Sequence, residues 1–230
     1  MNYKRITLLC GHYGSGKTNI AVNMAFDIKA QNKKVSIADL DIVNPYFRTK
    51  DSRTELEAAG IKLICSEYAG SNVDIPALPA EMYSLTDDKS SMAVLDIGGD
   101  DRGALALGRL APAILEENDY EIIAVINKYR PLTADAESTV EVLREIEGAM
   151  GMRFTSIINN SNLGEATTEE DVLASIEYAK SVSSLSSLPI YATTVEESLY
   201  ESLKDKIDNL FPLKLQKKVF SNREQDQKEV

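Results

Sequence analysis

One segment of the chain combines glycines, a lysine and a threonine at the spacing of a phosphate-binding loop. Gly11-His12-Tyr13-Gly14-Ser15-Gly16-Lys17-Thr18 fits the pattern G-x-x-x-x-G-K-[ST]. The glycines let the backbone turn its N–H groups inward, where they form an anion cradle with the N-terminus of the following helix. Lys17 is expected to reach the β- and γ-phosphates of a nucleoside triphosphate, and the Thr18 hydroxyl is expected to bind Mg²⁺. The expected nucleotide-binding residues of this segment are Gly11, Gly14, Ser15, Gly16, Lys17, Thr18 and Asn19.

The alternative interpretation of this segment is a glycine-rich turn that contains Lys-Thr by chance. In a chain of 230 residues such a match is expected roughly one time in a hundred. Residues 6–10 form an apolar run typical of a buried strand, and apolar residues recur at helical spacing after Lys17. The segment therefore lies between a predicted strand and a predicted helix, which is the context that the motif requires.

Short apolar runs alternate with amphipathic stretches along most of the chain. This alternation predicts an α/β fold of the P-loop NTPase kind, with a mostly parallel sheet of about seven strands flanked by helices on both faces. Strands are predicted at 6–10, 35–38, 61–65, 92–97, 120–126, 154–158 and 189–192. Helices are predicted after Lys17, before Gly60, and near 104–117, 134–150, 169–183 and 196–209. We expect one nucleotide-binding domain over residues 1–212, followed by a C-terminal helix end and polar tail over 213–230.

A site that hydrolyses nucleotides also needs carboxylates at the carboxyl ends of neighbouring strands. Asp39 and Asp41 follow one predicted strand at a spacing that points both side chains the same way, and Asp96 ends another. We expect Asp96 to hold Mg²⁺ through water and Gly99 to offer its backbone N–H to the γ-phosphate. The alternatives are a solvated turn for the Asp39 and Asp41 pair and a helix N-cap for Asp96. At least one member of the pair is expected to be functional.

Composition excludes several classes of function. The chain has 36 acidic and 25 basic residues, a net charge of −11 at pH 7. A nucleic-acid-binding face needs clustered positive charge, so no nucleic-acid partner is expected. With two cysteines, one histidine and no C-x-x-C pair, the chain cannot build a Cys/His-rich metal site by itself. Cysteines inside predicted strands, and the lack of a signal-peptide pattern or a membrane-length apolar run, indicate a cytoplasmic protein.

The phosphate loop, followed by Asp39-Leu40-Asp41 and then Asp96-Ile97-Gly98-Gly99, resembles the MinD/ParA group of P-loop ATPases. That group belongs with nitrogenase iron protein and the metal-insertion GTPases, and the resemblance spans roughly residues 4–212. It implies ATP and Mg²⁺ as cofactors, slow hydrolysis, a switch role on a protein partner, and a homodimer. In the group the second aspartate of the pair positions the attacking water, so Asp41 and Lys17 are the expected catalytic residues. Asp39 is then expected to help hold the Mg²⁺ shell.

The resemblance also implies contacts with the nucleotide base. In the group an asparagine at the end of a strand contacts adenine, and Ile158-Asn159-Asn160-Ser161 is similar to that strand end. Asn160 is the first choice for this contact and Asn159 the second. A loop start is the alternative, because asparagine is common in turns. The predicted strand at 189–192 leads to Thr193-Thr194, where the family loop lies over the base.

The chain departs from the group at His12, where the group has a signature lysine. In the group that lysine reaches across a dimer to the phosphates of the partner. A histidine carries far less positive charge than a lysine at neutral pH, so His12 is a poor replacement and could be only a solvated loop residue. If another cation takes the role in a nucleotide-linked dimer, Arg48 and Arg130 are the nearest candidates in the sequence. A constitutive dimer held by apolar contacts is the other possibility.

Two other activities and a membrane contact are compatible with parts of the sequence. A metallochaperone-type GTPase has a similar loop, but Asn127-Lys128-Tyr129-Arg130 has an arginine where the guanine-reading N-K-x-D motif has a carboxylate. A small-molecule kinase or ATP-dependent ligase of the dethiobiotin synthetase kind shares the fold, and its acceptor site could lie within 67–89. Residues 213–220 are short, basic and partly apolar, as a membrane anchor would be, but we favour packing of this segment on the domain.

Overall fold

Eight strands and their connecting helices make up the part of the chain that the computed structural model describes, residues 1–40, 52–65, 80–98 and 101–215. The strands are β1 (Ile6–Cys10), β2 (Val35–Leu40), β3 (Lys62–Cys65), β4 (Met92–Ile97), β5 (Tyr120–Ile126), β6 (Ser156–Asn159), β7 (Ile190–Glu196) and β8 (Leu210–Leu213). The α-helices are α1 (Lys17–Ala30), α2 (Arg53–Ala58), α3 (Ser84–Asp87), α4 (Asp101–Glu117), α5 (Ala136–Met150), α6 (Glu169–Ala174), α7 (Ile176–Ser186) and α8 (Glu197–Leu203). Single 3-10 turns are η2 (Ala80–Tyr83), η3 (Pro131–Thr133) and η4 (Gly164–Ala166).

All of these strands run parallel in one sheet, in the order β3-β2-β4-β1-β5-β6-β7-β8. Parallel neighbours need long crossover connections, and the helices provide them. The expected α/β fold with a parallel sheet is confirmed, with eight strands in place of about seven. Strand β1 lies inside the sheet between β4 and β5, so the loop that follows β1 opens at the middle of the carboxyl edge.

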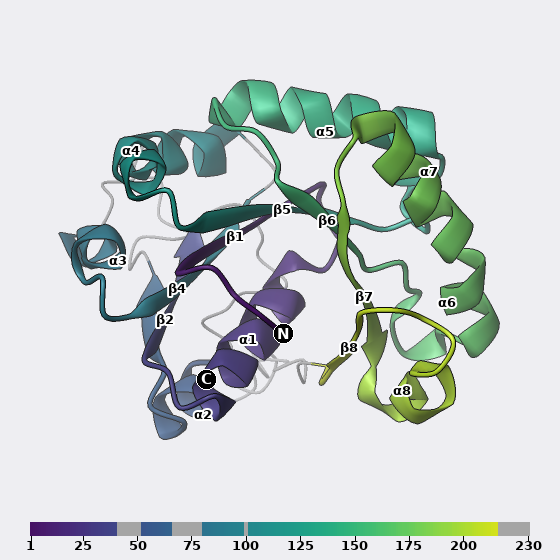
Figure 1. The fold of residues 1–230 in the computed structure, drawn as a ribbon, viewed down its shortest axis with the longest axis horizontal. Helices are drawn as coiled ribbons and strands as arrows, with labels where there is room; N and C mark the ends of the chain where they lie inside the picture. Colours follow the sequence, from purple (N-terminus) through teal and green to yellow (C-terminus); the bar gives the residue numbers. More distant parts are fainter. Residues whose placement is uncertain (41–51, 66–79, 99–100, 216–230) are drawn as a thin grey trace, which may run out of the picture.

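Helices cover both faces of the sheet (Figure 1). Helices α4, α5 and α7 lie on one face, and α1 and α2 lie on the other. Along β1, Ile6, Leu8 and Cys10 join the core beneath α4, α5 and α7, whereas Leu9 joins the core beneath α1. This alternation follows from the two-residue period of a strand. Because both faces are buried, β1 is apolar at almost every position, as the sequence pattern predicted.

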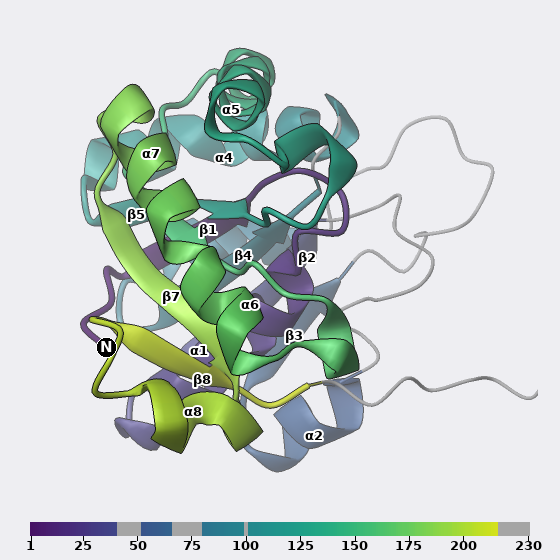
Figure 2. The same ribbon diagram turned by 90° about the vertical axis from the view of Figure 1, so that its right-hand side faces the viewer.

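The last described part of the chain forms an edge strand that the sequence analysis missed. β8 pairs with β7, and α6 and α8 lie beside these strands (Figure 2). The expected helix over 196–209 is therefore only α8, and the assignment of Leu213 to a helix end was wrong. Leu213 and Phe211 are buried against the core that contains α1, while pairing with β7 satisfies the backbone. Residues 216–230 of the expected tail lie outside the described residues.

Lys214, directly after β8, is hydrogen-bonded to α1 through its backbone. Asn23 on α1 donates from Nδ2 to the carbonyl of Lys214 at 3.0 Å. The backbone N–H of Lys214 donates in return to Asn23 Oδ1 at 2.9 Å. These two hydrogen bonds tie the end of the described chain to the helix that carries the phosphate loop.

A buried serine divides the helix expected over 169–183 into α6 and α7. Ser175 is fully buried, and its hydroxyl donates to the carbonyl of Val172 at 2.7 Å. The same hydroxyl accepts a hydrogen bond from Asn159 Nδ2 at 2.9 Å. The helix break therefore connects to the carboxyl end of β6, which lies close to the phosphate loop.

A buried arginine joins the start of β1 to the end of α4 and to the segment before β4. The Arg5 guanidinium forms a bidentate ion pair with Glu117 at the end of α4. It also donates to the carbonyls of Leu85 and Ser91, both at 3.0 Å. The hydrogen bonds from Arg5 lower the pKa of the Glu117 carboxyl below its ordinary value. Arg5 therefore fixes the beginning of the strand that ends in the phosphate loop.

We expect Arg5→Ala to lower the free energy of unfolding by about 3 kcal/mol, because it leaves a mostly buried carboxylate and two carbonyls without their partner. Because the folded-state pKa of Glu117 is lowered, this stabilisation is present above the ordinary glutamate pKa of 4.5 and is lost as the pH falls below it. The measurement is urea denaturation at pH 7 and at pH 4. Lys4→Ala is the matched control, since Lys4 pairs with Asp119 at the surface, and it should cost no more than about 0.5 kcal/mol. Equal effects of the two substitutions would contradict the role of Arg5.

Candidate nucleotide-binding site

The expected phosphate loop connects β1 to the N-terminus of α1. Lys17 is the first residue of α1, and Gly16 is its N-cap with φ +92°. In the described part of the chain, α1 has neither a side-chain cap nor an acidic residue in its first turn. The first N–H groups of a helix lack intrahelical partners and carry partial positive charge. This helix start is therefore suited to an external anion.

Two glycines of the loop are required by their surroundings. A Cβ atom on Gly11 would lie 2.4 Å from the carbonyl oxygen of Val125, and one on Gly16 would lie 2.2 Å from Asn160 Nδ2. Gly16 also has a left-handed backbone, which side chains disfavour. The loop can therefore pass this close to the ends of β5 and β6 only with glycine at both positions.

The carbonyl oxygens of the loop are bound by donors of the protein itself. Lys17 Nζ donates to the carbonyls of Gly11 at 3.0 Å and His12 at 3.3 Å. Arg130 Nε donates to the carbonyl of Gly14 at 2.8 Å, and Asn160 Nδ2 donates to that of Ser15 at 2.6 Å. Because the loop carbonyls have these partners, they do not need to turn toward the space that an anion would occupy. A phosphate oxygen is a stronger acceptor for Lys17 than a neutral carbonyl, so the ammonium can exchange one for the other.

Two buried polar atoms of the loop support a ligand at this position. Among the described residues, Ser15 Oγ and His12 Nδ1 have no hydrogen-bond partner. Ser15 is only 1% exposed. Buried polar atoms in folded proteins are almost always hydrogen-bonded, so an unsatisfied atom at a glycine loop calls for a ligand. A phosphate group would supply the acceptor that the Ser15 hydroxyl lacks, and the loop therefore fits a nucleotide.

Two acidic side chains lie at the carboxyl ends of the strands next to the loop. Asp39 on β2 is in register with Asp96 on β4, and Asp96 is in register with Leu9 on β1. The two aspartates are 8% and 0% exposed. Burial raises the pKa of the Cys10 thiol to about 12, while Lys17 lowers it and Asp96 raises it, so both charges lie near the end of β1.

The donor set of this region fits a magnesium ion. Mg²⁺ prefers hard oxygen ligands and keeps several waters, and it commonly takes one or two protein oxygens together with phosphates. Thr18 is 7% exposed and lies in the first turn of α1 beside the loop. The structure thus brings Thr18, Asp39 and Asp96 to the same edge of the sheet. Asp41, Gly99 and Arg48 lie outside the described residues.

Asn159 and Asn160 are both engaged in contacts within the protein. Asn159 donates to Ser175 and accepts from the backbone N–H and hydroxyl of Ser161. Asn160 Oδ1 accepts a hydrogen bond from the Thr194 hydroxyl at 2.5 Å, while its Nδ2 holds the phosphate loop. In this arrangement Asn160 braces the loop, and the base contact expected for it finds no support.

Thr193 and Thr194 also differ from the expectation. The predicted strand ends before them at residue 192, but β7 continues to Glu196, so both threonines lie within the strand and not in a loop. Both are buried. Thr194 was not recognised as a partner of Asn160, because the two residues are 34 positions apart and no local pattern connects them.

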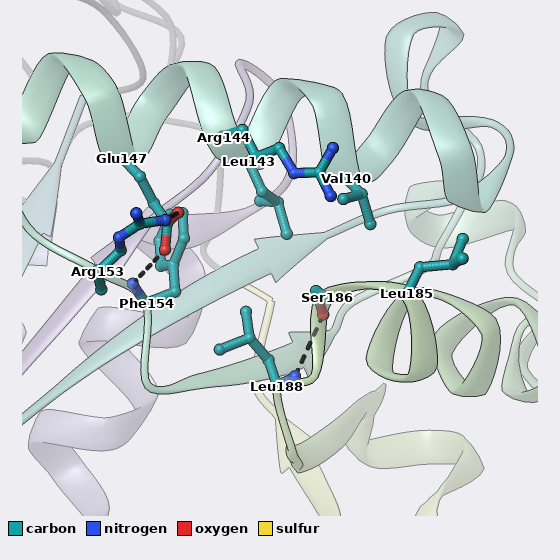
Figure 3. Close-up of a pocket in the computed structure, with 9 residues that line it drawn as sticks. All are labelled: Val140, Leu143, Arg144, Glu147, Arg153, Phe154, Leu185, Ser186 and Leu188. Carbon is teal, nitrogen blue, oxygen red and sulfur yellow. Dashed lines mark hydrogen bonds and ion pairs between the residues drawn. The ribbon is translucent and has the colours of Figure 1, made fainter.

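A cleft of about 320 Å³ lies between α5 and α7, away from the phosphate loop (Figure 3). Figure 3 shows Glu147 turned toward Arg153 and the backbone N–H of Phe154, beside apolar side chains of both helices. Phe154 precedes β6 and Leu188 precedes β7. The cleft is therefore at the amino ends of these strands, opposite to the nucleotide-binding edge, and is not part of the site.

Known proteins that resemble this chain have the fold of a nucleotide-binding domain. The family model CbiA, described as the CobQ/CobB/MinD/ParA nucleotide binding domain, matches residues 6–189. None of the curated proteins compared with the chain matches it. In the part of the chain that the structure describes, no helix is long and apolar enough to cross a membrane.

Solved structures of FtsY share the fold. FtsY from Mycoplasma mycoides is 18% identical with a TM-score of 0.54, covering 85% of this chain and 62% of that one. Chloroplast FtsY from Physcomitrella patens is 18% identical with a TM-score of 0.55, covering 84% and 59%. Signal recognition particle receptor FtsY from Elizabethkingia anophelis in complex with GDP is 13% identical with a TM-score of 0.50, covering 86% and 58%. The chain thus spans about three fifths of the length of these structures.

The bracing role of Asn160 predicts a loss of binding that does not depend on the base. Asn160→Ala removes the hydrogen bonds to Ser15 and Thr194, and we expect ATP and GTP to bind about tenfold or more weakly, by the same factor. Titration with fluorescent analogues of both nucleotides measures this ratio. Asn162→Ala is the matched control, because the side chain of Asn162 bonds only within its own loop, to the carbonyl of Asn160 and the N–H of Gly164, in the described structure. A selective loss of ATP binding in Asn160→Ala would instead establish the base contact.

Proposed function

Because the chain belongs to the CobQ/CobB/MinD/ParA family of nucleotide-binding domains, we propose that it binds ATP with Mg²⁺, hydrolyses it slowly and acts as a molecular switch on a protein partner. The observation that carries the proposal is the complete phosphate loop at the start of α1, whose carbonyls are bound and whose Ser15 hydroxyl lacks an acceptor. Mg²⁺ is typical of P-loop nucleotide hydrolases, and the register of Asp39 with Asp96 on neighbouring strands supports this part of the proposal.

In this proposal, phosphate binding, metal binding and positioning of the attacking water belong to different residues. Lys17 and the N–H groups at the start of α1 bind the phosphates and hold them in one orientation. Thr18 would provide a hydroxyl ligand for Mg²⁺, and Asp39 and Asp96 would help to hold the ion. When bound, the ion would supply positive charge against the phosphate oxygens. Asp41 positions the attacking water in this proposal, by the resemblance of its segment to the MinD/ParA group.

Adenine is the proposed base because the chain lacks the carboxylate that reads guanine after β5. Arg130 occupies that position, and it binds the phosphate loop. The side chains of Asn127 and Lys128 form hydrogen bonds within the protein. Asn127 Oδ1 accepts from the N–H of Tyr129 at 2.9 Å, and Lys128 Nζ donates to the carbonyl of Ala174 at 3.1 Å. The segment therefore offers no carboxylate acceptor for the exocyclic amine of guanine.

Guanine is the second candidate, favoured by one observation. The FtsY structure from Elizabethkingia anophelis that shares the fold contains GDP. At 13% identity the likeness supports the fold and leaves the base to local contacts. Nucleotide preference therefore has to be measured.

Lys17→Ala tests the phosphate site. Removing the ammonium takes away a charge-assisted contact to the phosphates, and we expect the affinity for Mg-ATP to fall at least about a hundredfold. Isothermal titration of wild type with Mg-ATP and Mg-GTP, followed by the variant, measures both the loss and the preference for ATP. Lys29→Ala is the matched control, because Lys29 lies in the last turn of the same helix. Unchanged Mg-ATP affinity in Lys17→Ala would refute the proposed site, and GTP affinity equal to or above ATP affinity would favour the GTPase.

Asp41→Ala tests hydrolysis separately from binding. Loss of the group that positions water should leave ATP affinity nearly unchanged and slow turnover roughly a hundredfold or more. Release of inorganic phosphate under saturating Mg-ATP measures the rate, with Asp208→Ala, an exposed aspartate between α8 and β8, as control. If Asp41→Ala abolishes binding while Asp39→Ala only slows turnover, the two roles are reversed.

A further inference from the structure

Arg130 lies against the apex of the phosphate loop, although 116 positions separate it from Gly14. Its Nε donates to the carbonyl of Gly14 at 2.8 Å. A Cβ built on Gly14 would lie 3.5 Å from Arg130 Nε, 3.8 Å from Cδ and 3.9 Å from Cζ. The stem and the central carbon of the guanidinium are therefore both close to this glycine, and the side chain lies over the loop.

The backbone that carries Arg130 is held in a tight turn after β5. The N–H of Arg130 donates to the carbonyl of Asn127 at 3.2 Å, and its own carbonyl accepts from the N–H of Thr133 at 3.0 Å. The Thr133 hydroxyl closes the turn on the same Asn127 carbonyl at 2.7 Å. Asn127 and Thr133 are buried, so the turn is anchored in the domain. The hydrogen bonds of this turn therefore fix the backbone position of Arg130 next to the loop.

Most of the hydrogen-bonding capacity of this guanidinium is unused. A guanidinium has five N–H donors, and one of them binds Gly14. Within the described residues, Arg130 forms no ion pair. Two terminal nitrogens with fork geometry next to a phosphate loop are suited to phosphate oxygens.

The loop itself supplies little positive charge. His12 is its one other basic side chain, and its Nδ1 is buried without a hydrogen-bond partner among the described residues. Lys17 is therefore the only lysine or arginine in the loop sequence 11–18. Charge that develops on a transferred phosphoryl group normally requires more than one positive group. Arg130 is placed to supply the missing charge.

We propose that Arg130 is a catalytic arginine that acts in cis, its terminal nitrogens binding the phosphates of the nucleotide held by the same chain. The inference rests on the proposed hydrolysis of ATP. In that reaction the water oxygen forms a bond to the γ-phosphorus, and the bond from phosphorus to the bridging oxygen breaks. The electron pair of the broken bond leaves with ADP, and the water proton passes to phosphate or to solvent. Arg130 stabilises the negative charge on the oxygens while these bonds change.

A cis role follows from the contact that Arg130 already makes. The side chain is bonded to Gly14 of its own loop, so it needs no second chain to reach the phosphates. Hydrolysis per chain is then independent of protein concentration, and dimer formation does not switch the reaction on. A trans role would require Arg130 to leave Gly14 and reach a second loop.

The first experiment separates catalysis from binding. Arg130→Ala should lower kcat about a thousandfold while Mg-ATP affinity falls no more than about tenfold, because the arginine acts mainly in the transition state. Arg130→Lys keeps the positive charge but loses the two parallel N–H donors of the guanidinium, so its kcat should lie between those of wild type and Arg130→Ala. Arg144→Ala is the matched control, since Arg144 is an exposed arginine on α5 far from the loop, and it should keep the wild-type kcat. Thermal unfolding of each variant checks that the fold is retained.

The second experiment separates cis from trans. Lys17→Ala chains, which keep Arg130, are mixed with Arg130→Ala chains, which keep Lys17, and phosphate release is measured. A cis arginine predicts no recovery of hydrolysis at any ratio, whereas recovery toward the wild-type rate would show a trans arginine and overturn the inference. If Arg130→Ala retains the wild-type kcat, this inference fails and the proposed function stands. If wild-type protein binds Mg-ATP but hydrolyses neither ATP nor GTP, the proposed hydrolysis itself is wrong.

Discussion

The phosphate loop holds its shape because donors from distant parts of the chain bind its carbonyl oxygens. Arg130 binds Gly14 and Asn160 binds Ser15, while Lys17 closes the loop on itself. The N–H and C=O groups of a tight loop cannot all be satisfied by one another. When the carbonyls have side-chain partners, they do not draw on the N–H groups at the start of α1, which can bind an anion. The binding of phosphate at this site depends on this separation of bound carbonyls from N–H groups that face the anion.

The order of the strands explains how the donors reach the loop. β1 has β5 and then β6 on one side, so the residues that follow these strands, Arg130 and Asn160, approach the loop from that side. β4 and then β2 lie on the other side and bring Asp96 and Asp39 to the loop. Cations and amides therefore lie on one flank of the loop and carboxylates on the other.

Binding a polyphosphate to a protein of net charge −11 requires a strong local field. The start of α1, Lys17 and Arg130 supply positive charge in the small region around the loop. Buried or partly buried charges are screened less by salt than charges on an open surface. The site can therefore attract an anion although the whole chain repels one, and composition alone is a poor guide to its ligand.

Much of the sheet could be predicted from the sequence because parallel strands are buried on both faces. Met92–Ile97 and Tyr120–Ile126 were predicted to the residue, since their apolar runs have clear boundaries. β8 was missed because Pro212 lies inside a run of only four residues, a pattern that is typical of an edge strand and weak on its own. The division of α6 from α7 depends on a contact of Ser175 with β6, which no helical pattern records.

The sequence by itself determined the phosphate loop, its place between a strand and a helix, and the two acidic strand ends, because each is a local pattern with a local physical cause. Only the tertiary structure decided what the loop is bound to. Asn160 has the same side chain whether it faces a base or a backbone carbonyl, and Arg130 lies far from Gly14 along the chain. Hydrogen bonds between residues more than a hundred positions apart depend on which strands become neighbours, and strand order is a property of the packed sheet.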